Sequence, residues 1–93
     1  METDKTNSNI KENRIGVVGI ILESPEENAA RINDILHDFA GIIVGRMGIP
    51  YRQRGVAVIA LTVDGTTDEI GAMTGKIGQL KNVTVKTALA PKK

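Results

Sequence analysis

The stretch VAVIALTVDGTTDEIGAMTGKIG, residues 56–78, carries a strand signal followed at once by a helix signal. Residues 56–65 are apolar at nearly every position and rich in β-branched side chains, which favours a strand buried on both faces. Thr66 and Glu69 then have the spacing of a capping box, which favours a helix start. We therefore predict a strand over residues 56–65 and a capped helix that Lys81 and Asn82 close.

The same order of signals occurs earlier in the chain. Residues 14–22, RIGVVGIIL, are apolar and β-branched and predict a second long strand. Ser24 is the expected N-cap of the helix that follows, with Pro25 at its first position, Glu27 completing a capping box and Gly41 as C-cap. At 100° per residue, one side of this helix forms an apolar stripe. The stripe consists of Ala29, Ile32, Ile35, Leu36 and Phe39.

Two further segments complete the pattern. Residues 42–48 predict a short strand followed by a turn region, and residues 83–89 alternate like an edge strand with one apolar face. The element order is therefore β-α-β-β-α-β, which predicts an α+β, ferredoxin-like sandwich. In that fold the antiparallel sheet has the order 4-1-3-2 and both helices cover one face. We expect residues 14–90 to form this domain and residues 1–13 a disordered arm.

The two central strands leave no polar side for water. Along residues 15–22 and 56–63, both sets of alternating side chains are apolar or glycine, apart from Thr62. Since both helices cover the same face of such a sheet, its other face would remain apolar and open. We expect self-association to cover it, so we predict a homo-oligomer whose sheets pack against each other or pair at their edges.

The amino-acid composition also favours an oligomer, and it argues against some classes of function. The 93 residues include one Phe, one Tyr and no Trp, so the core of a single subunit is small. There is no cysteine, and 12 basic against 11 acidic residues give a net charge of +1. These values predict a cytoplasmic protein without disulfides and without a strong field for nucleic acid. Neither a membrane span nor a signal-peptide core is present in the sequence.

Three glycines interrupt the second helix. Gly71, Gly75 and Gly78 cluster on the side of the helical wheel opposite to Met73 and Ile77. Each costs a helix interior about 1 kcal/mol relative to alanine. An outward stripe without side chains allows close approach by a partner helix or a ligand, so we interpret it as an interface. The alternative is that the helix is merely weak or ends early near Gly75. The spacing of GAMTGK does not fit a nucleotide phosphate loop.

The segment GRMGIPYRQRG, residues 45–55, is the most distinctive polar feature of the chain. It places Arg46, Arg52 and Arg54 around Pro50 and Tyr51. Arginines beside an aromatic ring favour an anion, a nucleotide or a nucleic-acid backbone as ligand, and Lys76 is a further candidate anion contact. The alternative is a solvated hairpin whose charges protect an edge strand from aggregation.

Catalytic and metal sites are not indicated. The single histidine, His37, lies off the apolar stripe of the first helix, so we expect it to be exposed. Without cysteine and with one histidine, the sequence predicts no metal site. No serine or threonine has a histidine base in a recognisable motif, so we expect neither an enzyme nor a cofactor.

The motifs VGRMGIPY (residues 44–51) and TGKIG (residues 74–78) resemble those of a small bacterial family described as iron-only hydrogenase system regulators. The resemblance covers residues 14–89. Members of that family are similar to ACT domains and to the C-terminal domain of the nickel-responsive repressor. The resemblance implies an ACT-like fold that forms dimers or tetramers and has a regulatory role.

Two features of that repressor do not transfer to this sequence. Its DNA-binding segment has no counterpart in an arm of about 13 residues, and its nickel site needs histidines and a cysteine, where this chain has only His37. Where many amino-acid-binding ACT domains have a loop glycine, this chain has ESPEE, residues 23–27. We therefore expect a non-catalytic transcriptional regulator that senses a small ligand or partner at a subunit interface made by Gly71, Gly75, Gly78, Arg46, Pro50 and Tyr51. The alternatives are a nucleic-acid-binding protein acting through the arginine-rich hairpin, and a purely structural assembly domain.

Overall fold

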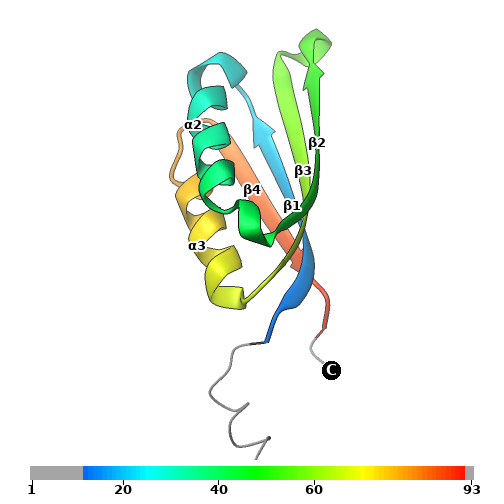
Figure 1. Ribbon diagram of the computed structural model, residues 1–93. Coiled ribbons are helices and arrows are strands. Elements are labelled where there is room, and N and C mark those ends of the chain that lie inside the picture. Colours follow the sequence, from blue (N-terminus) through cyan, green and yellow to red (C-terminus); the bar gives the residue numbers. More distant parts are fainter. Residues whose placement is uncertain (1–11, 92–93) are drawn as a thin grey trace, which may run out of the picture.

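The computed structural model describes residues 12–91, which form one layer of sheet and one layer of helices (Figure 1). The expected domain, residues 14–90, lies within this range, whereas residues 1–11 of the expected arm lie outside the described part. The elements are β1 (Arg14–Leu22), α2 (Pro25–Asp38), β2 (Ile43–Tyr51), β3 (Val56–Gly65), α3 (Thr67–Gly78) and β4 (Val83–Leu89). Short 3₁₀ helices at Ala40–Ile42 and Arg52–Arg54 flank β2.

The predicted topology is confirmed. The four strands form one antiparallel sheet in the order β2-β3-β1-β4, so the two strands that are apolar on both faces are central. Gly19 of β1 lies opposite Ala60 of β3 and Lys86 of β4, and Ala60 lies opposite Met47 of β2. Because cross-strand partners share a face, this register assigns each paired strand residue to the side of the sheet that carries the helices or to the opposite side.

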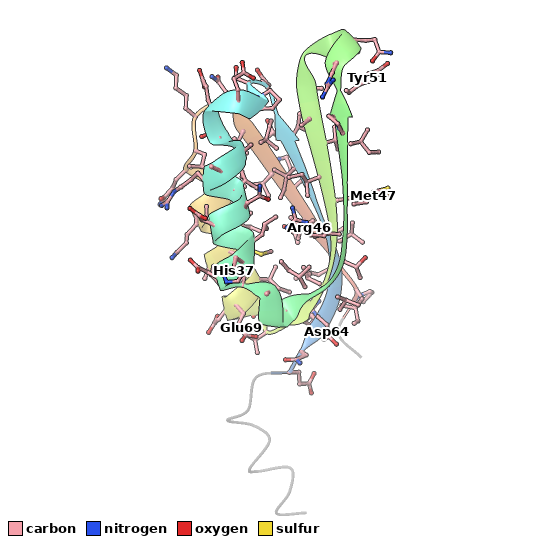
Figure 2. All side chains as sticks on the ribbon, turned by 45° about the horizontal axis from the view of Figure 1, so that its top comes forward. His37, Arg46, Met47, Tyr51, Asp64 and Glu69 are labelled. Carbon is pink, nitrogen blue, oxygen red and sulfur yellow. The ribbon has the colours of Figure 1, made fainter. Side chains whose placement is uncertain are left out.

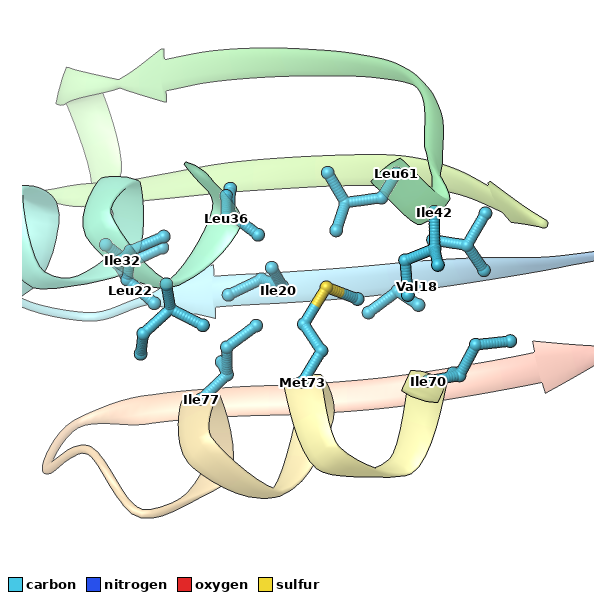
Figure 3. Packing of buried hydrophobic residues seen from close by; sticks show 12 residues of the cluster. Val18, Ile20, Leu22, Ile32, Leu36, Ile42, Leu61, Ile70, Met73 and Ile77 are labelled. Atoms are coloured by element: carbon cyan, nitrogen blue, oxygen red, sulfur yellow. The ribbon is translucent and has the colours of Figure 1, made fainter. Parts of the chain in front are cut away.

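The hydrophobic core lies between the sheet and the two helices (Figure 3). Val18, Ile20 and Leu22 of β1 are at most 1 % exposed. The side chains packed around them come from α2, α3, β3 and the first 3₁₀ helix. These are Ile32, Ile35, Leu36, Ile42, Leu61, Val63, Ile70, Met73 and Ile77. Burial of each such side chain stabilises the fold by about 1.5–3 kcal/mol before entropy costs, so this aliphatic layer is what holds the helices on the sheet.

The predicted capping box of α3 is confirmed, and that of α2 is wrong. The Glu69 backbone N–H donates to Thr66 Oγ1 at 3.1 Å, and the Thr66 N–H donates to Glu69 Oε1 at 2.9 Å. Ser24 makes no side-chain cap, and Glu27 Oε1 instead accepts a bond from Asn82 Nδ2 at 3.3 Å. The Glu27 carboxylate therefore connects α2 to the loop before β4 and does not return to Ser24.

Other boundaries also differ from the predictions. α2 ends at Asp38 with Phe39 as its C-cap, so Gly41 is not the cap and lies within the following 3₁₀ helix. Ala29, predicted to be buried, is exposed, because the side of α2 that carries it faces an open groove beside β2. β2 continues to Tyr51, beyond the predicted end at residue 48. α3 ends at Gly78, before Lys81 and Asn82, and the chain turns at Asn82 with a φ of 64°.

Among residues 12–91, no helix has both the length and the apolar character needed to cross a membrane.

The two helix starts allow a matched test. Thr66→Ala removes a side chain that satisfies a backbone N–H, so we expect it to lower the free energy of unfolding by about 1 kcal/mol. Ser24→Ala removes a hydroxyl that makes no cap, so we expect a loss of less than about 0.5 kcal/mol. Urea denaturation of both variants at one protein concentration measures the difference. Equal losses would contradict the capping assignment.

Candidate functional site

The face of the sheet away from the helices is apolar and uncovered within the described residues. Val17 is 53 % exposed, Met47 61 % and Ile49 52 %, although all three lie on strands. The register places further apolar side chains on the same side. They are Ile15, Ile21, Tyr51, Val56, Val58, Ala60 and Ala88. We refer to this side as the open face. Contiguous apolar surface of this kind marks an interaction site.

The centre of the open face is hollow. A shallow cavity of about 240 Å³ lies there, lined among others by Val17, Gly45, Met47 and Ala60. Next to Ala60 the register places Gly19, where an added Cβ would meet nothing within 4 Å. Small residues at the centre and large ones around them leave a depression in the open face. A side chain of a partner can insert into this depression.

On the helix side, β2 is also uncovered. From Val44 to Tyr51 every residue of this strand is exposed, because α2 buries Ile32, Ile35 and Leu36 in the core and leaves β2 beyond the helix layer. A groove between α2 and β2 results, and Figure 2 shows His37 and Arg46 on its two sides. The groove contains one cavity of about 410 Å³ and one of about 430 Å³. Both volumes fall within the range of small-molecule sites.

Arg46 is held across the groove. Its Nη2 donates a hydrogen bond of 3.0 Å to Oδ1 of Asn33 on α2. Beyond this bridge, towards the end of α2, the larger cavity is lined by Asn33, Leu36, His37, Ala40, Ile43, Val44, Gly45 and Arg46. Three polar side chains, those of Asn33, His37 and Arg46, thus share a cavity with apolar walls.

The other cavity lies at the tip of the β2–β3 hairpin. Pro50 and Arg52 line it together with Pro25, Glu26, Ala29, Gly55 and Val56. Arg54 is exposed at the same tip but lines none of the cavities described here, and Tyr51 points to the open face. The predicted site residues of the arginine-rich segment are therefore divided: Arg46, Pro50 and Arg52 lie in the groove, and Tyr51 on the opposite side of β2.

The glycines of α3 lie elsewhere. An added Cβ at Gly71 or Gly75 would meet nothing within 4 Å, so both positions are open, whereas at Gly78 it would lie 3.5 Å from Val85 of β4. The helix continues to Gly78, so the alternative of an early end near Gly75 is wrong. α3 packs beside β4, at the edge of the sheet away from β2, so one subunit does not bring these glycines together with Arg46 and Pro50.

Two other residues that the sequence analysis singled out have local roles. Lys76 Nζ lies 5.8 Å from the centroid of the Phe39 ring, in a cation–π contact that joins α3 to the end of α2. His37 is exposed as predicted, but it lies on the wall of the groove. Within residues 12–91, no group of three or more His, Cys, Asp or Glu residues is arranged to hold a metal ion.

Asn33 and His37 are the site residues that sequence reasoning missed. They are separated by one helical turn and share the side of α2 that faces β2, next to the exposed Ala29. The available signal was this second, partly polar stripe beside the apolar one.

Comparison with known proteins identifies close relatives. A family model described as "TM1266-like: Iron-only hydrogenase system regulator, putative" matches residues 14–87. The structure of the uncharacterized protein TM1266 from Thermotoga maritima is 36 % identical, with a TM-score of 0.82, and the match covers 86 % of this chain and 100 % of that chain. The family resemblance inferred from the sequence motifs is confirmed.

More distant structures share the fold alone. A formyltetrahydrofolate deformylase from Pseudomonas putida KT2440 matches with a TM-score of 0.59 and 11 % identity, over 83 % of this chain and 29 % of that chain. An unknown protein from Galdieria sulphuraria matches with a TM-score of 0.60 and 12 % identity, over 88 % of this chain and 48 % of that chain. Among curated proteins, none matches the chain significantly.

The glycine stripe stays a prediction, and one substitution tests it. Gly75→Ala adds a methyl group in open space within a helix, so we expect the free energy of unfolding of the subunit to rise by up to about 1 kcal/mol. If the stripe contacts a second subunit, the same methyl group weakens assembly, which light scattering over a dilution series measures. Greater stability with unchanged assembly would exclude the stripe as an interface.

Proposed function

The chain belongs to the TM1266-like family of iron-only hydrogenase system regulators, and we propose that it is a non-catalytic regulatory domain that works as a homo-oligomer. In this proposal a second subunit covers the open face, and a small ligand binds beside β2. The observation that carries the proposal is the uncovered apolar face of the sheet. The family description supports a regulatory role.

The extent of the open face suits a subunit interface. Strands about 4.8 Å apart that rise about 3.3 Å per residue give a four-stranded face of roughly 20 by 25 Å. The accessible area of its side chains exceeds this flat projection of about 500 Å². A stable interface buries about 800 Å² on each partner, so face-to-face packing of two sheets is of the right order.

A second copy of the same chain fits the chemistry of this face. Within the described strands, its charged side chains are Asp64 on β3 and Lys86 on β4, one of each sign. A two-fold axis brings the same surface patch of both subunits together, so each acid can meet the base of the other copy at the rim. Met47, which is flexible and 61 % exposed, is of a suitable size to enter the hollow around Ala60 of the partner.

β2 contributes residues both to the groove and to the open face. Its alternate residues point to opposite sides: Arg46 and Pro50 line the groove, whereas Met47 and Tyr51 lie on the open face. A ligand that binds in the groove and shifts β2 therefore also shifts the surface presented to the second subunit. This is a direct route by which a ligand changes assembly, provided that it binds the two arrangements with different affinity.

We also propose that the protein is cytoplasmic and that the oligomer controls transcription by contacting a partner. The rival function is direct nucleic-acid binding, which the exposure of Arg52 and Arg54 at the hairpin tip favours. A mobility shift that weakens steeply with salt and is lost in the double variant Arg52→Gln, Arg54→Gln would support the rival. A purely structural assembly domain would form the oligomer and bind no small ligand.

Assembly through the open face can be tested with two glycines of the sheet. An added Cβ meets nothing within 4 Å at either Gly19 or Gly48, but Gly19 lies on the open face and Gly48 on the helix side of β2. Gly19→Lys introduces a second charge beside Lys86 into the proposed interface. We expect it to yield single subunits of 10.0 kDa, whereas Gly48→Lys keeps the mass of the wild-type oligomer.

Size-exclusion chromatography with light scattering measures these masses. A wild-type protein that remains a 10.0 kDa monomer at high concentration would overturn the proposal. Assembly that survives in Gly19→Lys would exclude the open face as its location.

A further inference from the structure

We propose that Asn33, His37 and Arg46 form a binding site for the oxyanion group of a small ligand, in the cavity between α2 and β2. This inference rests on the proposed function, because it names the chemical class of the regulatory ligand.

Two elements bring the three side chains together. Asn33 and His37 are four residues apart on α2 and therefore lie on the same side of the helix, one turn from each other. Arg46 comes from β2, at a position whose cross-strand partner is the buried Leu61, so its side chain starts on the helix side of the sheet. All three line one cavity of about 430 Å³.

The Arg46 guanidinium is positioned and still has free donors. Its single described hydrogen bond, from Nη2 to Asn33 Oδ1 at 3.0 Å, fixes the group across the groove. A guanidinium carries five N–H donors in a rigid fork that matches carboxylate and phosphate oxygens. Within residues 12–91, no carboxylate forms an ion pair with Arg46 in the structure, so its charge is available to a ligand.

The other polar groups also favour an anion. With Asn33 Oδ1 engaged by Arg46, the amide presents its N–H₂ as a donor, and the His37 imidazole supplies a ring N–H. No acidic residue lines this cavity, although Asp34 and Asp38 are on the same helix. The cavity at the hairpin tip differs, because Glu26 lines it together with Arg52.

The other residues that line the cavity indicate the size and polarity of the rest of the ligand. Leu36, Ile43 and Val44 are apolar, and the backbone at Gly45 completes the wall on the side of β2. The site therefore suits a compact molecule with a carboxylate or phosphate group and a small apolar body. Carboxylates and phosphates share the oxyanion chemistry that these donors recognise.

The test is isothermal titration calorimetry of the full chain at low ionic strength, with inorganic phosphate in one series and acetate in the other. We expect saturable binding of at least one of the two anions, with one site per chain. Arg46→Gln removes the charged donor and is expected to weaken binding at least about tenfold. Asn33→Asp places a carboxylate beside Arg46 with almost no change in shape and is expected to abolish binding.

Arg54→Gln is the matched control, because it removes the same charge at an exposed position outside the cavity. We expect it to change the affinity less than twofold. Tighter binding of phosphate would indicate that the ligand carries a phosphate group, and tighter binding of acetate that it carries a carboxylate. Equal weakening by Arg46→Gln and Arg54→Gln, or no saturable binding of either anion, would overturn the site.

Light scattering on the same samples separates this inference from the proposed function. An oligomer that binds neither anion would overturn only the oxyanion site. A monomer that binds anion through Arg46 would retain the site and overturn the oligomeric regulator.

Discussion

The structure depends on the burial of one side of β1 and β3 beneath two helices. Val18, Ile20, Leu61 and Val63 are at most 1 % exposed and belong to one cluster with the buried side chains of both helices. The same two strands are apolar on their second side, which no helix covers within the described residues. A sheet with two apolar sides and a single helix layer exposes one apolar side to water in an isolated subunit. The proposed assembly follows from this imbalance.

β2 is the element on which the account of function depends. It is an edge strand that is exposed on both sides, since α2 packs on the central strands and leaves a groove beside it. Its backbone continues as a strand through Pro50, and proline is tolerated in edge strands such as β2. In the proposed function, a ligand in the groove on one side of β2 acts on the subunit contact on its other side, over the thickness of one sheet.

Much of the fold could be predicted because local signals agreed with the global topology. β1, β3 and β4 have the predicted bounds, since glycine, charged residues and capping signals limit their apolar runs. The prediction failed where distant residues compete for local groups: Glu27 bonds to Asn82, which is 55 positions away, and so does not cap α2. The candidate site was only partly predictable. Arg46 could be singled out because it lies in an arginine-rich segment. Its hydrogen bond to Asn33 and the cavity that it lines together with His37 depend on how α2 packs against the sheet.

Oxidation of methionine by dilute hydrogen peroxide reports whether a second subunit covers the open face, because Met47 lies on that face and is 61 % exposed in the subunit, whereas Met73 is fully buried. Mass spectrometry of peptides gives the rate at each residue over a range of protein concentrations, with free methionine as reference. We expect Met47 to be protected at concentrations where the oligomer forms and to react rapidly after dilution to subunits, while Met73 stays protected throughout. Rapid oxidation of Met47 at every concentration would contradict coverage of the open face by a second copy of the chain.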